Sequence, residues 1–287
     1  MDHNISLIMD HYKFVKNKKF IIYKKYIFIF IKKLKFFFRS FFSKISPLIK
    51  KDTYDVAWQS EINNYRKWFN KDNRSQLFCF NKELFIASGG MTQRFWQYYV
   101  FSFLKEKQPK KVLEIGSGNG INLCLFSTYF EKTNFHGIDI STEGVKNSNI
   151  LKTENFEDSF FEGWPIKAES KLSRNVNFKE QNAKKLSFKD SEFEFVYSIL
   201  ALEQMDDIKD KVIDEMARVS SKYVCFVEPF IEYNRSLLSF FHHRGSKYFS
   251  YKIKDLKKHN LKVLEVYDHH PNKVTLGVAA VLCEKIN

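Results

Sequence analysis

A glycine-rich turn and an acidic residue downstream of it offer the clearest chemistry in the sequence. Glu114 ends a short apolar segment and is followed by Gly116, Gly118 and Gly120. Glycines at such a turn let the backbone adopt positive φ angles and approach a ligand closely. Asp139 lies nineteen residues after Gly120 and ends the next apolar segment. A carboxylate at that place accepts hydrogen bonds from ribose hydroxyls, so the pattern predicts a nucleoside-containing ligand.

Two common nucleotide-binding motifs are excluded by the spacing. The dinucleotide motif GxGxxG needs a third glycine three residues after the second, where this sequence has Ile121. The phosphate-binding motif GxxxxGK[ST] does not occur anywhere in the chain. What remains is E-x-G-x-G-x-G at the end of one strand and an acid at the end of the next.

This arrangement resembles motifs I and II of the class I S-adenosylmethionine-dependent methyltransferases, in particular their type 11 group. Further segments match the family in the same order: residues 181–183 after the third strand, 193–198 and 200–204 at the methyl-transfer pocket, and 215–219 and 223–228 as the helix and strand that follow. The resemblance covers residues 110–287. It implies a Rossmann-like open sheet of seven mostly parallel strands.

The resemblance also implies S-adenosylmethionine as the methyl donor. Glu114 would help to hold the ammonium group of this cofactor, Asp139 would bind its ribose, and the adenine would lie near Ile140. Asn182 stands where the family often has an acid at the adenine edge. The expected cofactor-binding residues are Glu114, Gly116, Ser117, Gly118, Gly120, Asp139, Ile140, Asn182, Ala183 and Ser198. Methyl transfer is an in-line displacement, so the enzyme chiefly aligns the acceptor and excludes water.

The acceptor side is less well defined by the sequence. An acceptor hydroxyl needs a general base, and His242 or His243 follows the fifth strand on the expected ligand side. Arg235 or Arg244 would hold an anionic acceptor. The alternative for the two histidines is a surface loop without a catalytic role. Because no acidic cluster lies near them in the sequence, we expect no metal site.

The elements that position these residues alternate between strand and helix from Lys110 onward. Apolar segments predict strands over residues 111–115, 135–140, 176–180, 193–198, 223–227, 261–267 and 274–283. Helices are expected over residues 121–130, 142–151, 207–219 and 252–259. This alternation predicts an open α/β sheet with helices on both faces, and a ligand at the carboxyl ends of the strands.

The N-terminal arm, residues 1–51, is strongly basic. It carries thirteen Lys and Arg residues against two Asp, so it holds most of the formal net charge of +14. Within residues 18–45, the apolar residues at helical spacing form one stripe: Phe20, Tyr23, Ile27, Phe30, Leu34, Phe38, Phe41 and Ile45. Lysines interrupt every apolar run, so no segment of the arm is long enough to span a membrane.

Three alternatives remain for this arm. A basic helix with a broad apolar face binds anionic membrane surfaces. The same pattern also suits a helix that packs on its own domain or on a partner protein. A nucleic-acid-binding arm is disfavoured, because a continuous apolar stripe suits lipid better than phosphate.

The predicted organisation has three parts: the arm over residues 1–51, a helical cap over 52–108 and a methyltransferase domain over 109–287. The first hypothesis is a methyltransferase that acts on a small molecule, a glycan or a lipid-linked acceptor at the cytoplasmic face of a membrane. An RNA or other nucleic-acid methyltransferase is the second, and a membrane-associated scaffold without turnover is the third. The four cysteines form no CxxC pair, which suits a reducing compartment.

Overall fold

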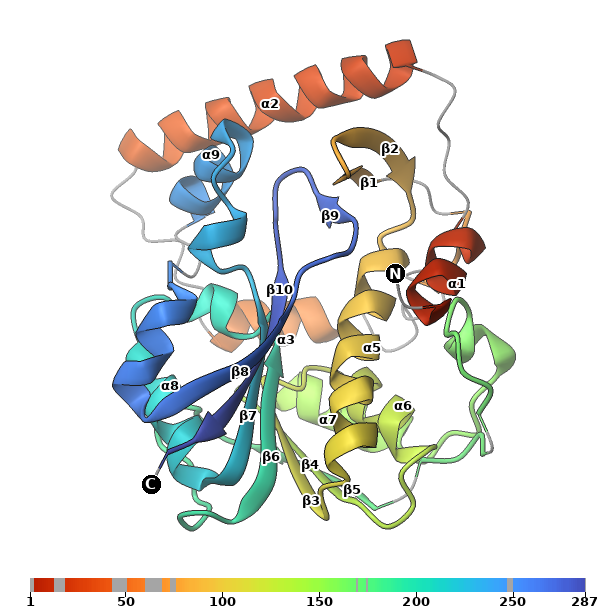
Figure 1. The fold of residues 1–287 in the computed structure, drawn as a ribbon, viewed down its shortest axis with the longest axis vertical. Helices are drawn as coiled ribbons and strands as arrows, with labels where there is room; N and C mark the ends of the chain where they lie inside the picture. The colour runs from red at the N-terminus through yellow and green to blue at the C-terminus, as the bar shows by residue number, and fades with distance from the viewer. Residues whose placement is uncertain are drawn as a thin grey trace.

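The computed structural model has a central seven-stranded sheet covered by helices (Figure 1). The structure describes residues 3–12, 19–42, 51–59, 69–72, 76–168, 170–173, 175–246 and 250–286. Parts of the predicted arm and cap, including Ile45, lie outside these ranges. The sheet confirms the fold class expected from the sequence.

Five neighbouring strands of the sheet are parallel, and the last strand of the chain is antiparallel to its neighbours. In spatial order the strands are β5 (Val176–Glu180), β4 (Asn134–Asp139), β3 (Lys111–Ile115), β6 (Phe193–Ile199), β7 (Ser220–Glu228), β10 (Ala279–Lys285) and β8 (Leu261–Tyr267). The central strands are short and buried on both faces, which explains their nearly continuous apolar sequences. The carboxyl ends of β3, β4, β5 and β6 therefore lie side by side.

Alternation along each strand divides the core into two layers. Val112 belongs to the core on one face of the sheet, whereas Leu113 and Ile115 belong to the core on the other. The first layer is closed by α5 (Gly90–Lys107), α6 (Ile121–Ser127) and α7 (Thr142–Leu151). The second layer is closed by α8 (Lys209–Val219) and the 3-10 helix η4 (Ile253–His259). Glu114 lies between Leu113 and Ile115 and so points into the first layer.

The prediction of a helical segment over residues 52–108 is wrong for its middle part, which forms a β-hairpin. β1 (Gln76–Phe80) pairs with β2 (Glu83–Ala87), and β9 (Asn272–Lys273) joins β1 from the far end of the chain. Asn81 and Lys82 both have positive φ angles, 47° and 65°, as a two-residue hairpin turn requires. The strand predicted over 274–283 begins only at Ala279, as β10, because residues 274–278 form the loop between β9 and β10.

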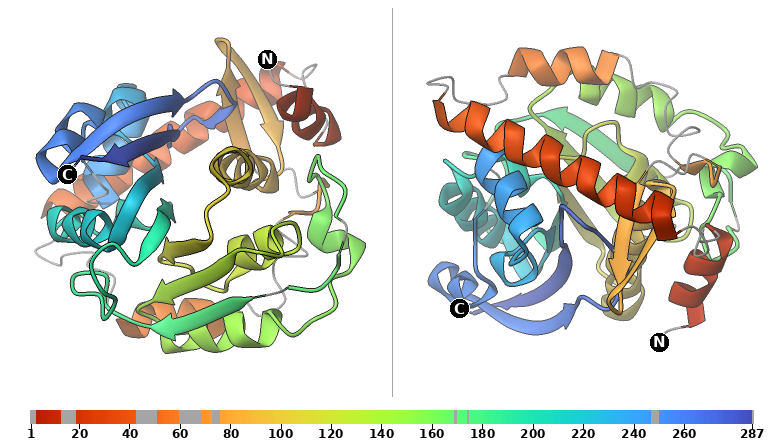
Figure 2. Two further views of the ribbon diagram at one scale, coloured as in Figure 1. Left: turned by 60° about the horizontal axis from the view of Figure 1, so that its bottom comes forward. Right: turned by 90° about the horizontal axis from the view of Figure 1, so that it is seen from above.

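Helices α1 (His3–His11), α2 (Lys19–Phe42) and α3 (Lys51–Gln59) precede the hairpin. Figure 1 shows α2 lying across one end of the molecule, above α9 (Leu237–Ser246) and the hairpin. Figure 2 shows α3 at a different place, alongside α7. The remaining 3-10 turns are η1 (Asp158–Phe161), η2 (Leu202–Gln204) and η3 (Ile231–Tyr233).

Candidate functional site

The glycine turn between β3 and α6 has the backbone conformation that its sequence predicts. Gly116, Gly118 and Gly120 have φ angles of 70°, 52° and 79°. The turn is fastened to its surroundings: the Ser117 N–H donates to the Ile138 carbonyl at 2.9 Å, and the Ser148 hydroxyl donates to the Gly118 carbonyl at 2.8 Å. These bonds hold the turn at the carboxyl ends of β3 and β4.

Asp139 is bonded directly to this turn. Its Oδ2 accepts the Gly118 N–H at 2.8 Å, and its Oδ1 accepts the Ser141 N–H at 2.8 Å. Burial raises the pKa of Asp139, while hydrogen bonds from the backbone N–H groups of Ser141, Gly118 and Ile140 lower it. An ionised carboxylate has about four lone-pair positions, so these backbone bonds leave room for a ligand hydroxyl group.

Glu114 is buried beneath the turn, with a side chain that is 1% exposed. Its Oε1 accepts from the Asn122 amide at 2.7 Å, and Tyr197 lies beside it in the register of β3 and β6. Burial raises the pKa of Glu114 to about 8, and the bond from Asn122 opposes that shift. The glutamate therefore anchors the first turn of α6, and burial favours its neutral form.

The other expected cofactor residues follow neighbouring strands. Ile140 is 36% exposed directly after β4, and Ser198 is buried near the end of β6. Asn182 and Ala183 follow β5, where the Asn182 Oδ1 accepts the Lys184 N–H at 3.0 Å. Four strand ends thus bring the predicted set to one edge of the sheet.

Comparison with known proteins gives the family. A model described as a methyltransferase domain matches residues 113–223, which include the glycine turn, Asp139 and the strand ends described above. Residues 113–223 of this chain therefore form a methyltransferase domain. This identification confirms the family, the reaction class and the methyl donor expected from the sequence, and it argues against the non-catalytic scaffold.

Two solved structures of one other methyltransferase agree with the fold of this chain. Magnesium protoporphyrin IX methyltransferase from Synechocystis, with bound SAM, superposes with a TM-score of 0.52 at 11% identity, over 85% of this chain and 99% of that chain. The same enzyme with bound SAH gives a TM-score of 0.50 at 12% identity, over 67% of this chain and 83% of the other. A SAM-dependent methyltransferase from Methanosarcina mazei gives 0.48 at 17% identity, over 61% and 92%.

The residues present fit the methyl donor. The Ser117 hydroxyl is buried in the turn and has no hydrogen-bond partner among the described residues. Gly116 has room for no side chain, since an added Cβ would lie 2.5 Å from the Cβ of Ala201. Asp139, the glycine turn and Ser117 would hold the nucleoside and the methionine part. When bound, S-adenosylmethionine supplies a methyl group on a positively charged sulfur.

Helix α3 contributes residues that the sequence analysis did not assign to the site. The Trp58 ring lies against the glycine turn: a Cβ on Gly118 would be 2.6 Å from Trp58 Cζ2. Asp55 Oδ1 accepts the Ser141 hydroxyl at 2.6 Å, and Tyr54 donates to Gln204 Oε1 at 2.5 Å. In the sequence, Tyr54 and Trp58 are four residues apart, which indicates that they share one face of a helix. This spacing does not indicate which part of the protein that face contacts.

His242 and His243 lie on α9, where this helix packs against α2. His242 Nδ1 lies 2.9 Å from Lys33 Nζ. Burial and then the charge of Lys33 lower the pKa of His242 to about 3, and the same causes lower the pKa of His243 to about 4. The general-base role of these histidines stays a prediction. The contact with Lys33 argues against it for His242, because it engages the nitrogen that would accept the proton.

A second acidic group lies on the acceptor side and was missed as a candidate base. Glu203 follows β6 in η2, two residues after Ala201, which touches the glycine turn. It is 8% exposed, and its Oε2 has no hydrogen-bond partner in the part of the chain that the structure describes. Burial raises the pKa of Glu203 to about 7, and the nearby Lys273 ammonium opposes that shift. A carboxyl with this pKa suits proton transfer at neutral pH.

Glu228 ends β7 next to this acid. Its Oε1 accepts the N–H groups of Ala201 and Leu202, each at 3.1 Å, so it shapes the loop that carries Glu203. Burial raises the pKa of Glu228 to about 8. Arg235 and Arg244, expected as anion ligands, are exposed near α9. Their role also stays a prediction.

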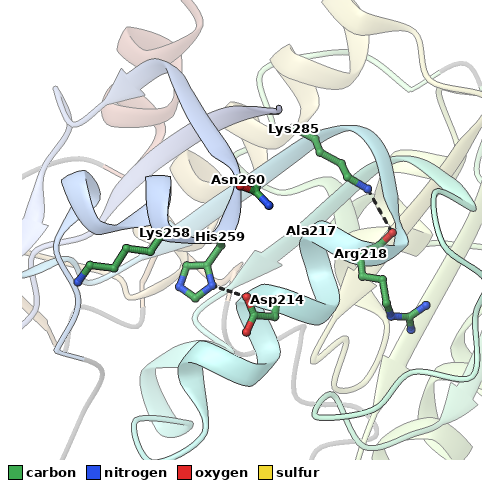
Figure 3. Close-up of a pocket in the computed structure, with 7 residues that line it drawn as sticks. All are labelled: Asp214, Ala217, Arg218, Lys258, His259, Asn260 and Lys285. Carbon is green, nitrogen blue, oxygen red and sulfur yellow. Dashed lines mark hydrogen bonds and ion pairs between the residues drawn. The ribbon is translucent and has the colours of Figure 1, made fainter. Parts of the chain in front are cut away.

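The open hollow shown in Figure 3 is separate from this site. It is lined by residues of α8, η4 and the end of β10: Asp214, Ala217, Arg218, Lys258, His259, Asn260 and Lys285. His259 Nδ1 lies 2.6 Å from Asp214, and Tyr251 lies 2.6 Å from His259 Nε2. These contacts join η4 to α8, so the cluster of Asp214, Tyr251 and His259 has a structural role. Among the described residues, no group of three His, Cys, Asp or Glu side chains is arranged to hold a metal.

Proposed function

We propose that this methyltransferase acts at the cytoplasmic surface of an anionic membrane, on an amphiphilic acceptor such as a lipid-linked glycan or a small lipophilic molecule. The observation that carries the proposal is the exposed face of α2. This helix has 24 residues, with six lysines, one arginine and no acidic residue. No described helix is both long and apolar enough to cross a membrane.

The stripe predicted from the sequence faces solvent for most of its described length. Phe20 is 81% exposed, Tyr23 61%, Ile27 55% and Phe38 52%. These four residues recur at intervals of three, four and eleven along the helix, so they lie on one face. Side chains as large as these rarely gather on a surface that contacts only water, and such patches mark interaction sites.

Another side of α2 attaches the helix to the methyltransferase domain. Ile22 is 4% exposed, and Phe37 and Phe30, the latter at the edge of the predicted stripe, make ring contacts with Phe241 of α9 at 5.3 Å and 5.9 Å. The contact between Lys33 and His242 lies on the same side. Two of the alternatives for the arm are therefore compatible, since one face packs on the domain and the other stays exposed.

Charge favours a lipid surface as the partner of the exposed face. Lys24, Lys35 and Arg39 are exposed beside the apolar stripe. A cationic helix with such a stripe lies in the interface plane of an anionic bilayer, and each basic residue near that surface contributes about 1 kcal/mol. α9 adds two further exposed apolar side chains, Leu237 at 69% and Phe240 at 49%.

The position of α2 supports an amphiphilic acceptor. The segment after β7, on the acceptor side of the sheet, leads through η3 into α9, which α2 covers. A membrane bound to α2 would thus adjoin the acceptor side. An acceptor that partitions into the membrane would be concentrated at this point.

Vesicle sedimentation tests the surface. We expect vesicles with about one-third anionic phosphatidylserine to sediment the full chain, and neutral phosphatidylcholine vesicles to sediment much less. The double variant Phe20→Ser and Ile27→Ser should lose binding by about tenfold or more. The matched control, Ile150→Ser, removes an apolar side chain that is 43% exposed on α7 and should bind normally. Equal sedimentation of both variants would contradict the proposal.

Label transfer tests the acceptor class. Methyl-tritiated S-adenosylmethionine is incubated with the full chain and a lysate of the cells that make it, and the label is followed into the organic phase and into RNA. Label in the organic phase supports the amphiphilic acceptor. Label in RNA would instead support a nucleic-acid methyltransferase. The same conclusion would require that the chain binds RNA in a salt-dependent way and that the double variant Phe20→Ser and Ile27→Ser does not.

A further inference from the structure

Helix α3 lies against the glycine turn, at which the methyl donor is expected to bind. It runs alongside α7 (Figure 2) and reaches the loop after β6 through Tyr54. Between these two attachments it passes over the glycine turn, because the Trp58 ring packs directly against Gly118. Gly144, in the first turn of α7, also lies close to this ring: an added Cβ would be 3.2 Å from Trp58 Cδ1.

Specific hydrogen bonds fix α3 in this position. Asp55 Oδ1 accepts from the Ser141 hydroxyl at 2.6 Å and from the Glu143 N–H at 3.2 Å, at the start of α7. The Asn147 amide donates to the Trp58 carbonyl at 2.7 Å. Ser141 connects this set to the ribose-binding acid, since its own N–H donates to Asp139. The helix is therefore fastened to the cofactor site itself and not only to the surface near it.

Two polar atoms close to Trp58 are buried without a hydrogen-bond partner among the described residues: Trp58 Nε1 itself and Oδ1 of Asn147, whose amide donates to the Trp58 carbonyl. Buried donors and acceptors are nearly always paired, and leaving one unpaired costs about 1–3 kcal/mol. One is a donor on α3 and the other an acceptor on α7. A buried donor and a buried acceptor that both stay unpaired on two packed helices indicate a polar ligand beside them.

We propose that Trp58 is a donor-binding residue and that α3 forms the roof of the S-adenosylmethionine site. The ring covers the ligand at the glycine turn and excludes water from it. The indole N–H donates a hydrogen bond to an oxygen of the donor, either its carboxylate or a ribose hydroxyl. The inference rests on the assignment of the methyl donor and is independent of the proposed membrane surface.

Calorimetry with S-adenosylhomocysteine and the full chain tests this role. Trp58→Ala should weaken binding by about tenfold or more, because it removes both the ring and the N–H. Trp58→Phe keeps an aromatic ring and should weaken binding by less, about threefold to fivefold. Val56→Ala is the matched control, since Val56 is 67% exposed on the same helix. Its binding should be unchanged.

Two outcomes would contradict the proposal that α3 covers the donor site. Unchanged affinity in a folded Trp58→Ala would show that the ring does not touch the ligand. Tighter binding would show that Trp58 occupies the place of the ligand and must leave before it binds. Thermal unfolding of each variant establishes that it is folded, and vesicle binding of Trp58→Ala should equal that of the unchanged chain, which separates this test from that of the membrane surface.

The attachments of α3 provide a kinetic test. Tyr54→Phe removes the bond to Gln204, and Asp55→Ala removes both bonds to the start of α7. If α3 is the roof, either change should speed S-adenosylhomocysteine dissociation by about fivefold in stopped-flow experiments. Dissociation at the unchanged rate in both variants would show that the ligand leaves by a path that α3 does not cover.

Discussion

The backbone N–H of Gly118 donates a hydrogen bond to Oδ2 of Asp139 at 2.8 Å. The two residues belong to separate motifs and lie on loops that follow adjacent parallel strands. Their bond joins the turn that is expected to approach the methionine part of the donor to the acid that is expected to bind its ribose. We therefore expect a change at Asp139 to affect both halves of the cofactor site.

Asp139→Ala should weaken S-adenosylhomocysteine binding by at least about tenfold, because it removes the ribose acceptor and releases Gly118. Calorimetry measures the affinity. Asp158→Ala is the control, since the side chain of Asp158 is 93% exposed and forms only a surface ion pair with Lys171. Equal affinity of the two variants would remove the ribose assignment.

Gly120→Ala should destabilise the fold by about 2 kcal/mol. Gly120 has a φ angle of 79°, and an added Cβ would lie 2.6 Å from Phe178 Cζ and 2.9 Å from Ser148 Cβ. Gly89→Ala meets nothing closer than 3.5 Å at an ordinary φ angle, so it should change stability by less than about 0.5 kcal/mol. Denaturant unfolding compares the two, and equal losses would contradict the predicted strain.

Glu228→Gln should make the folding stability of the methyltransferase depend less on alkaline pH. Because burial raises the pKa of Glu228 from 4.5 to about 8, the folded state binds a proton that the unfolded state releases above pH 4.5. Stability is therefore lost as the pH rises from about 4.5 to 8, and glutamine, which carries no charge, avoids this loss. We expect the variant to gain about 2 kcal/mol or more over the unchanged chain at pH 8.5 and little at pH 4.5.

Denaturant titrations at the two pH values measure this difference. Glutamine retains an oxygen that accepts the Ala201 and Leu202 N–H groups, so the loop should keep its shape. A gain that is the same at both pH values would show that it does not come from ionisation.

Lys273→Met should raise the pKa of Glu203. The Lys273 ammonium favours the ionised carboxylate and opposes the effect of burial. Infrared titration of the carboxyl stretch, with Glu203→Gln to identify the band, should show a group that titrates at about 7 in the unchanged chain and higher in the variant. A band that titrates at the same pH in both would show that Lys273 does not act on this acid.

The sequence by itself determined those elements whose structure depends on the types and spacing of neighbouring residues. The strand over residues 111–115, the glycine turn and the acid that ends the second strand could be predicted because strand burial and turn conformation depend on neighbouring residues. The same reasoning failed for the hairpin of β1 and β2. Its aromatic residues also suit a helix, and its third strand comes from residues nearly two hundred positions later.

Only the tertiary structure decided which distant segments complete the site. Trp58 lies sixty residues before Gly118 and Lys273 seventy residues after Glu203, so no spacing rule relates either pair. The structure also decided which face of α2 packs on α9, because both faces carry large apolar side chains and the sequence alone ranks them equally. Helical periodicity shows which residues share a face. Which face is buried depends on the shape and chemistry of the surface opposite, and this is set only when the whole chain folds.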